Sequence, residues 1–197
     1  TSECLERAAL AMKSMARSGK KILFVATKKQ AREIIAAGAK TINMPYVTDR
    51  WLGGMMTNFA TIRRSVKKMN NLEQMLTDGT LSSTTKKERL TLTREMNKLN
   101  KVLGGISDIN RLPHAIFIVD IGREHLALAE AKKLGIKTFA MVDTNADPNL
   151  VDFPIPANDD SSKSISFITN YITNAIKEGL AERGKEKEEH AEESAKA

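Results

Sequence analysis

Short apolar runs separated by helical patterns are the feature that most narrowly limits how this chain can fold. The runs ILFVA at 22–26 and AIFIV at 115–119 each hold five consecutive apolar residues. Runs of this kind are typical of strands buried on both faces, as in parallel sheets covered by helices. KTFAMVD at 137–143 and the shorter VDFPI at 151–155 continue the pattern. The sequence therefore predicts an α/β domain with a parallel sheet.

Helical patterns lie between these runs. Leu5, Ala8 and Met12 recur at spacings of three and four in the opening segment, and Gly19 can end that helix. TINMPYV at 41–47 is read as another strand. Further helices are expected at 28–37 with Gly38 closing it, at 123–134, and at 161–180. Right-handed crossovers place the loops after Ala26, Val47, Asp120 and Asp143 on one sheet edge, where a ligand or partner is expected.

The middle of the chain contains no plausible strand. One apolar stripe comprises Ile62, Val66, Met69, Leu72 and Leu76, and a second comprises Leu92, Met96, Leu99 and Leu103. Asp78-Gly79 marks a turn between them, and Thr85 with Glu88 predicts a capping box. Stripes this narrow cover only the partner helix, which favours a projecting coiled-coil hairpin with most of its charge free.

We therefore expect three parts. Residues 1–56 and 104–180 form the α/β domain, with helices on both faces of the sheet, and residues 57–103 form the inserted helical hairpin. Residues 181–197 carry four basic and six acidic side chains and almost no large apolar residue, which indicates a solvated or disordered tail.

Charge and composition favour a polyanionic partner. The chain has 31 Lys and Arg against 24 Asp and Glu, and segment 57–103 alone has ten against four. Segment 143–160 instead has five Asp and no basic residue. The single cysteine, Cys4, cannot form an internal disulfide, and apolar runs of five are too short to cross a bilayer. We expect a cytoplasmic protein without a membrane partner, and no homo-oligomer.

Signatures of catalysis are weak. Neither a dinucleotide fingerprint nor a phosphate-cradling lysine loop occurs, and the three histidines lack neighbours at metal-ligand spacing. Asp120, Glu124 and His125 could form an acid-base set, but structural roles at a helix start explain them better. DTNADPN at 143–149 looks like a substrate loop, but its residue types suit a turn and its acidity would repel a phosphate backbone, which indicates a structural turn or a protein-facing surface. We expect no catalytic residue, no metal and no cofactor.

Basic residues cluster where an anion could bind. Lys28, Lys29 and Arg32 fall at a strand-to-helix junction, where backbone N–H groups and the helix dipole favour a phosphate. On the hairpin, Arg63-Arg64 and Lys67-Lys68 stack like charges at a spacing of four, which a polyanion would relieve. Solvated helix surfaces explain each cluster too. A long basic hairpin suits irregularly shaped RNA better than the major groove of DNA.

Several motifs in order carry a resemblance to a known family. They are RWLGGMMTN, a basic helical hairpin, LGGISDINRLPHAIFIVD, EAKKLGIKTFAMVDTNADP and DFPIPANDDSSKSI. Over nearly all of residues 1–180 the chain resembles the bacterial small-subunit ribosomal protein two family. The resemblance implies a Rossmann-like or flavodoxin-like three-layer α/β domain with an inserted coiled-coil hairpin. It also implies a non-enzymatic protein of the small ribosomal subunit that binds small-subunit ribosomal RNA and neighbouring ribosomal proteins, and that helps to dock the large protein that captures messenger RNA.

Two departures from the family pattern stand out. The family usually has a Gly-His-Phe-Gly-His-like stretch and a first strand before the ECLERAA helix, so we expect a truncated or disordered N-terminal segment. Lys137 replaces a common proline at a strand entrance, where a local effect is expected.

Three functions therefore remain open. The leading prediction is an RNA-binding structural protein, and the others are a small-molecule or nucleotide-binding enzyme on a flavodoxin-like fold and a protein-only scaffold whose hairpin pairs with another helix. Trp51 either stacks on RNA or braces its loop, and Asn58 either binds RNA or caps the outgoing helix. The expected RNA contacts are Lys28, Lys29, Arg32, Arg50, Trp51, Asn58, Arg63, Arg64, Lys67 and Lys68.

Overall fold

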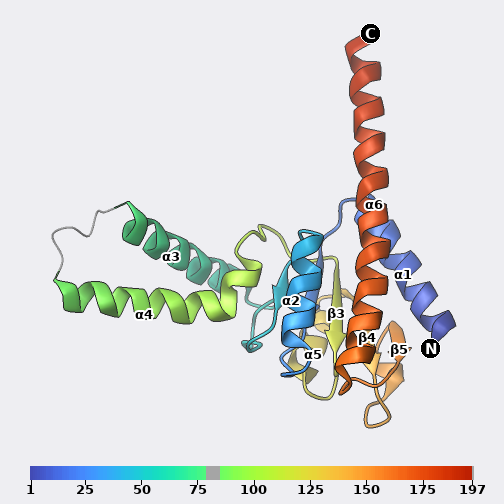
Figure 1. The fold of residues 1–197 in the computed structure, drawn as a ribbon, viewed down its shortest axis with the longest axis horizontal. Coiled ribbons are helices and arrows are strands. Elements are labelled where there is room, and N and C mark those ends of the chain that lie inside the picture. Colours follow the sequence, from blue (N-terminus) through green and yellow to red (C-terminus); the bar gives the residue numbers. More distant parts are fainter. Residues whose placement is uncertain (79–84, 197) are drawn as a thin grey trace.

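Five parallel strands form a single sheet in the order β2-β1-β3-β4-β5 (Figure 1). The computed structural model describes residues 1–78 and 85–196. Placing β1 between β2 and β3 puts a reversal of the strand order there, as in flavodoxin-like folds. The expected α/β fold with a parallel sheet is confirmed. The strands are β1 Ile22–Val25, β2 Tyr46–Val47, β3 Ala115–Val119, β4 Lys137–Val142 and β5 Phe153–Pro156.

Alternate residues of each strand face two separate apolar layers. Ile22 and Phe24 of β1 pack with the helices α1, α2 and α6, whereas Leu23 and Val25 pack with α5 and the base of the helical hairpin. Because both faces are covered, every residue of β1 and β3 is buried. The helices are α1 Ser2–Arg17, α2 Arg32–Thr41, α5 His125–Lys133 and α6 Ser162–Lys196.

The two helices of the middle segment lie side by side and project from the sheet (Figure 1). They are α3, Phe59–Thr77, and α4, Lys86–Leu103, which continues into the short 3-10 helix η1, Gly104–Ile106. On α3 the apolar stripe is buried from Ile62 to Leu72. The Thr85 and Glu88 capping box is present, but the expected turn at Gly79 lies outside the described residues.

Two expected boundaries are wrong. Gly38 does not end the second helix, because α2 continues to Thr41 and packs on α6. A Cβ at Gly38 would lie 2.9 Å from Thr169 Cγ2, so this glycine permits close helix packing. The strand expected at 41–47 is reduced to Tyr46 and Val47. Thr41 still belongs to α2, and the chain then turns at Asn43, whose φ is 54°, before β2 begins.

The last helix does not end near Leu180, as we expected, but runs to Lys196 and rises beyond α1 (Figure 1). Ion pairs with α1 extend past the expected end: Lys13 Nζ lies 2.9 Å from Glu182 Oε1, and Arg17 pairs with Glu186. Alanine, glutamate and lysine, which favour helix, dominate residues 181–196. Within the described ranges, no helix combines the length and apolarity needed to cross a bilayer.

Gly105 provides a test of how the hairpin base packs on the sheet. A Cβ at this position would lie 2.1 Å from the carbonyl oxygen of Tyr46, so η1 can approach β2 only because residue 105 has no side chain. We expect Gly105→Ala to lower the free energy of unfolding by about 2 kcal/mol, measured by chemical denaturation. Gly53→Ala, with nothing within 4 Å, is the control and should change it by less than about 0.5 kcal/mol. Equal losses of unfolding free energy in the two variants would show that the close approach of η1 to β2 does not depend on Gly105.

Candidate nucleic-acid interface

One carboxylate on α5 holds the segment RWLGGMMTN. Glu130 Oε1 accepts hydrogen bonds from Trp51 Nε1 at 3.2 Å and from the Gly54 N–H at 2.7 Å. Its Oε2 accepts from the N–H groups of Met56 at 3.0 Å and Thr57 at 2.9 Å, and from the Thr57 hydroxyl at 3.0 Å. Partial burial alone would raise the pKa of Glu130, but the N–H donors lower it below its usual value. The ionised carboxylate thus fixes the loop that leads into α3.

Trp51 packs inside the molecule. Its side chain is buried at 6% exposure in the apolar layer that contains Val47, Met55 and Ile106. A base could stack on this indole only after the loop had left Glu130. Of the two roles left open for Trp51, the geometry favours bracing, and Gly54, at φ 89°, supplies the backbone turn that keeps the indole there.

Asn58 marks the start of α3 at the surface. It is the N-cap residue, yet its side chain makes no cap bond to the helix backbone. Its Oδ1 accepts instead from the Thr61 hydroxyl at 2.9 Å, and its own N–H donates to the Gly54 carbonyl at 2.8 Å. In the part of the chain that the structure describes, the side-chain amide NH₂ has no partner, so it is available to an external acceptor.

The four basic residues on α3 differ in how they are paired. Arg63 donates two hydrogen bonds of 3.0 Å to the carbonyl and side-chain oxygens of Asn110. Lys68 Nζ reaches Glu95 Oε1 on α4 at 2.5 Å. Arg64 and Lys67 are exposed, and neither has an ion-pair partner among residues 1–78 and 85–196. Arg64 and Lys67 therefore provide positive charge that nothing described in the chain neutralises.

A hollow of about 310 Å³ lies between α3 and the loop that follows η1. Its described lining contains no acidic side chain, so it is electrostatically suited to an anion such as a phosphate. The polar lining residues are Arg63, Arg64, Lys67, Asn70, Ser107 and Asn110.

The remaining predicted contacts lie at the carboxyl ends of β1 and β2. Lys29 and Arg50 are exposed, and within the described ranges neither forms a hydrogen bond or ion pair. Arg32 is held more firmly: its Nε donates to the Thr27 carbonyl at 2.8 Å, and its other nitrogens reach Asp49 at 3.2 and 3.4 Å. Lys29 and Arg50 thus resemble Arg64 and Lys67, whereas Arg32 is partly committed to the protein.

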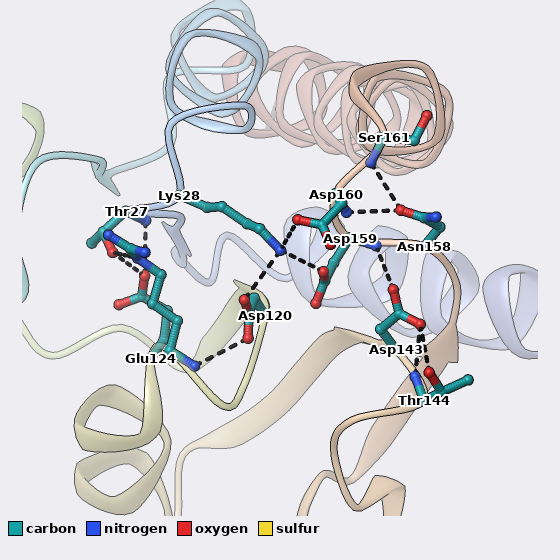
Figure 2. A network of polar contacts seen from close by, with 11 residues as sticks. Thr27, Lys28, Asp120, Glu124, Asp143, Thr144, Asn158, Asp159, Asp160 and Ser161 are labelled. Atoms are coloured by element: carbon teal, nitrogen blue, oxygen red, sulfur yellow. Dashed lines mark hydrogen bonds and ion pairs between the residues drawn. The ribbon is translucent and has the colours of Figure 1, made fainter.

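Lys28, one of the expected phosphate contacts, is enclosed by acidic residues (Figure 2). Its Nζ lies 2.6 Å from both Asp159 Oδ1 and Asp160 Oδ1 and 3.3 Å from Asp120 Oδ2, and its side chain is only 13% exposed. Burial would lower the pKa of Lys28, but its bonds to Asp159, Asp160 and Asp120 raise it above the usual value. The cation is therefore satisfied internally.

This cluster fills the position where flavodoxin-like folds bind ligands. Lys28 follows β1 and Asp120 follows β3, the neighbouring strands between which the strand order reverses. Figure 2 shows the Lys28 side chain extending past Asp120 to Asp159 and Asp160 in the turn before α6. The ligand site expected at this sheet edge is thus occupied at its centre by the protein's own ion pairs.

The candidate acid-base residues also have structural partners. Glu124 is 3% exposed, and its Oε1 accepts from the N–H and the hydroxyl of Thr27. His125 Nδ1 lies 3.3 Å from the Gly122 carbonyl oxygen. Both residues thus tie the start of α5 to neighbouring backbone, which is the structural alternative.

In the described part of the chain, one cluster of three carboxylates has oxygen atoms close enough together to hold a metal ion. It consists of Asp143, Asp159 and Asp160. The Lys28 ammonium already supplies a cation to two of these three carboxylates. Asp143 Oδ1 additionally accepts from the Thr144 N–H at 2.7 Å. Because these oxygens are already bonded within the chain, the cluster is better explained by structure than by a metal.

DTNADPN forms a turn. Asp147 Oδ1 accepts from the Asn149 N–H at 2.9 Å and caps the 3-10 helix η2, Pro148–Leu150. The structural alternative for this segment therefore accounts for its Asp, Asn and Pro residues.

Sequence reasoning missed Glu130 and Asn110. Glu130 lies 73 to 79 residues from its partners, and Asn110 lies 47 residues from Arg63. In sequence, Glu130 looks like any exposed glutamate on a helix. No local pattern could have identified either residue, because only the folded chain brings their partners to them.

Glu130→Gln tests the carboxylate's hold on the loop. An amide cannot accept all five donors, so we expect the free energy of unfolding at pH 7 to fall by about 2 kcal/mol in chemical denaturation. Because folding lowers the pKa of Glu130, its contribution is complete above the unfolded pKa and is lost as pH falls through the folded pKa. The difference between wild type and variant should therefore narrow below about pH 4. Glu33→Gln, at an exposed position on α2, is the control. A comparable loss of unfolding free energy in this variant would show that the hydrogen bonds to Glu130 do not stabilise the loop.

Lys28→Met tests the ion cluster. Removing the cation leaves Asp159, 1% exposed, beside two other carboxylates, so we expect a loss of about 3 kcal/mol at pH 7. Burial already raises the pKa of Asp159, and a raised folded pKa stabilises the folded state most at low pH. The loss in the variant should thus shrink as the pH falls from 7 towards the ordinary Asp pKa of about 4. Lys29→Met, at the exposed neighbouring position, should cost less than about 0.5 kcal/mol, and similar losses for both would contradict the assignment.

Comparison with known proteins agrees with this architecture. The family model described as ribosomal protein S2 matches residues 1–179. The chain is 64% identical over 166 residues to small ribosomal subunit protein uS2 of Cytophaga hutchinsonii. The aligned region covers 84% of this chain and 65% of that protein. It is 57% identical over 168 residues to the uS2 protein of Chlorobium chlorochromatii, with 85% and 67% covered.

A third relative, the uS2 protein of Porphyromonas gingivalis, is 57% identical over 164 residues, with 83% of this chain and 58% of that protein covered. The chain thus spans about two thirds or less of the length of these curated relatives. Since the family model matches the sheet, the hairpin and the first half of α6, the chain belongs to the ribosomal protein S2 family.

Proposed function

We propose that this chain is a structural constituent of the small ribosomal subunit that binds small-subunit ribosomal RNA. The observation that carries the proposal is the set of cations with no internal counter-charge around the base of α3, beside a hollow without acidic lining. Membership of the ribosomal protein S2 family and the uS2 names of the relatives support it. The location that follows is the cytoplasm, on the small ribosomal subunit.

The proposed RNA contacts are narrower than the sequence alone indicated. Lys29, Arg50, Arg64 and Lys67 have no partner among the described residues and lose nothing by binding phosphates. Arg63 and Lys68 can contribute at their exposed ends while keeping their protein contacts. Asn58 and Arg32 are secondary candidates. Lys28 and Trp51 are left out, because the first is enclosed by carboxylates and the second is buried.

We further propose that the acidic segment faces protein. Asp147 lies on an exposed turn, and its carboxylate would repel an RNA backbone. Neighbouring small-subunit proteins, including the large protein that captures messenger RNA, are the partners proposed for this side. The enzyme alternative has no specific support, because Lys28 and its carboxylates fill the crevice that a cofactor would need.

RNA binding measured against salt tests this function. Replacing Arg63, Arg64, Lys67 and Lys68 together by Gln removes up to four phosphate contacts, each of which contributes roughly 0.7 to 0.9 to the slope of log affinity against log salt. We expect the slope to fall by at least about 1.5, since Arg64 and Lys67 are fully available and the other two residues are partly committed internally. Filter binding to a small-subunit ribosomal RNA transcript provides the measurement.

The matched control removes the same charge elsewhere. Lys132, Lys133, Lys163 and Lys177 are exposed and lie outside the hairpin, so their replacement by Gln should leave the slope nearly unchanged. Equal slopes for the two quadruple variants would show that the basic residues of α3 do not bind RNA phosphates. Deletion of residues 57–103 with full retention of RNA binding would instead favour the protein-only scaffold.

A further inference from the structure

A larger cavity, of about 530 Å³, opens at the opposite edge of the sheet, where the strands begin. Its walls come from the turn before β1, the end of α2, the start of β2, and the segment 104–114 between η1 and β3. The sequence patterns indicated a ligand site at the carboxyl ends of the strands, and this edge lies opposite them. The volume lies within the range of sites that take a small molecule or one nucleotide.

Basic groups in this cavity lack counter-charges. Lys21, Lys40 and Arg111 are exposed lining residues, and across the described ranges none of them forms an ion pair. Lys21 Nζ donates to the Asn43 carbonyl at 2.7 Å, and Lys40 Nζ lies 5.7 Å from the centre of the Tyr46 ring. Asp108 is the acidic residue in the described lining, and its Oδ1 accepts from the Ser107 hydroxyl at 3.2 Å.

At the carboxyl edge, Lys28 and Arg32 are paired with aspartates of the same chain, and Lys29 and Arg50 are not. At the amino edge, none of the three cations that line the cavity has a carboxylate partner among the described residues. Three cations converging on a concave site favour an external anion.

The loop after η1 connects this cavity to the hollow beneath α3. Ile109 and Asn110 line both spaces, and Arg63 is bonded to Asn110 from the α3 side. An RNA strand that contacts Arg64 and Lys67 would cross this loop and enter the cavity next. Continuity with the basic face of α3 favours RNA over an acidic peptide as the occupant.

We propose that this cavity takes one unpaired nucleotide of the ribosomal RNA, with Lys21 and Lys40 binding phosphate and Arg111 offering its guanidinium plane to the base. Proteins read single-stranded RNA by such contacts, since unstacked bases pack on aromatic rings and guanidinium groups. The inference rests on the proposed function and adds to the interface a second part, which contacts a base as well as the phosphate backbone.

A triple variant, Lys21→Gln with Lys40→Gln and Arg111→Gln, tests the site in the full chain. We expect its dissociation constant for a small-subunit ribosomal RNA transcript to rise at least about tenfold and its salt slope to fall by about two. Lys132→Gln with Lys133→Gln and Lys163→Gln removes the same charge outside the cavity and should match wild type. The single variant Arg111→Glu, at an exposed position, should also weaken binding and guards against a folding defect in the triple variant.

Photo-crosslinking gives an independent readout. With 4-thiouridine in the transcript, we expect crosslinked peptides from segment 104–114, and their loss on addition of an unlabelled single-stranded RNA but not of a duplex. Absence of crosslinks there, or equal competition by the duplex, would overturn the nucleotide site.

The failures are distinguishable. If wild type shows no salt-dependent RNA binding, the proposed function itself fails. If Arg64→Gln with Lys67→Gln weakens binding while the cavity variant behaves as its control, the nucleotide site alone fails. If the cavity variant keeps RNA affinity but loses binding to a labelled decaglutamate peptide, the cavity is a protein-docking site and the inference is overturned.

Discussion

The hydrogen bonds to Glu130 are the contact on which the rest of the interface depends. Five donors from RWLGGMMTN converge on this one carboxylate, which belongs to α5 on the far side of the loop. Because the loop joins β2 to α3, its backbone sets the direction in which the basic hairpin leaves the sheet (Figure 1). Burial of Trp51 beneath the same loop adds apolar packing to a polar restraint. Together they hold the α3 cations in fixed positions relative to the sheet.

Charge is divided between the two edges of the sheet. At the carboxyl edge, Lys28 and three aspartates close the crevice that other proteins of this fold use for ligands. Such a cluster costs desolvation and is repaid by close pairing, so it locks the loops around it and leaves no unpaired cation at its centre. At the amino edge, Lys21, Lys40 and Arg111 have no ion-pair partner among the described residues, and on α3 neither have Arg64 and Lys67. The centre of the usual ligand site of the fold is thus taken by the chain's own ion pairs.

Local patterns predicted the buried strands and most helices because five-residue apolar runs and three-four spacing depend only on nearby residues. The capping box at Thr85 is equally local and is confirmed. Gly38 shows where such reasoning stops, since a glycine that resembles a helix end instead lets α2 approach Thr169 of α6. The continuation of α6 to Lys196 was likewise missed, because the ion pairs from Lys13 and Arg17 to its later turns come from the other end of the chain.

The sequence by itself determined the α/β class, the interrupting helical segment, the family resemblance, and which residue types could meet an anion. Tertiary structure decided which of those cations are available. Lys28 and Lys29 are adjacent and chemically identical in the sequence, yet one is surrounded by carboxylates that follow β3 and β5 and the other is exposed. The reason is that neutralisation is a short-range interaction between groups 92 to 132 residues apart along the chain, and only the packed sheet brings them within bonding distance.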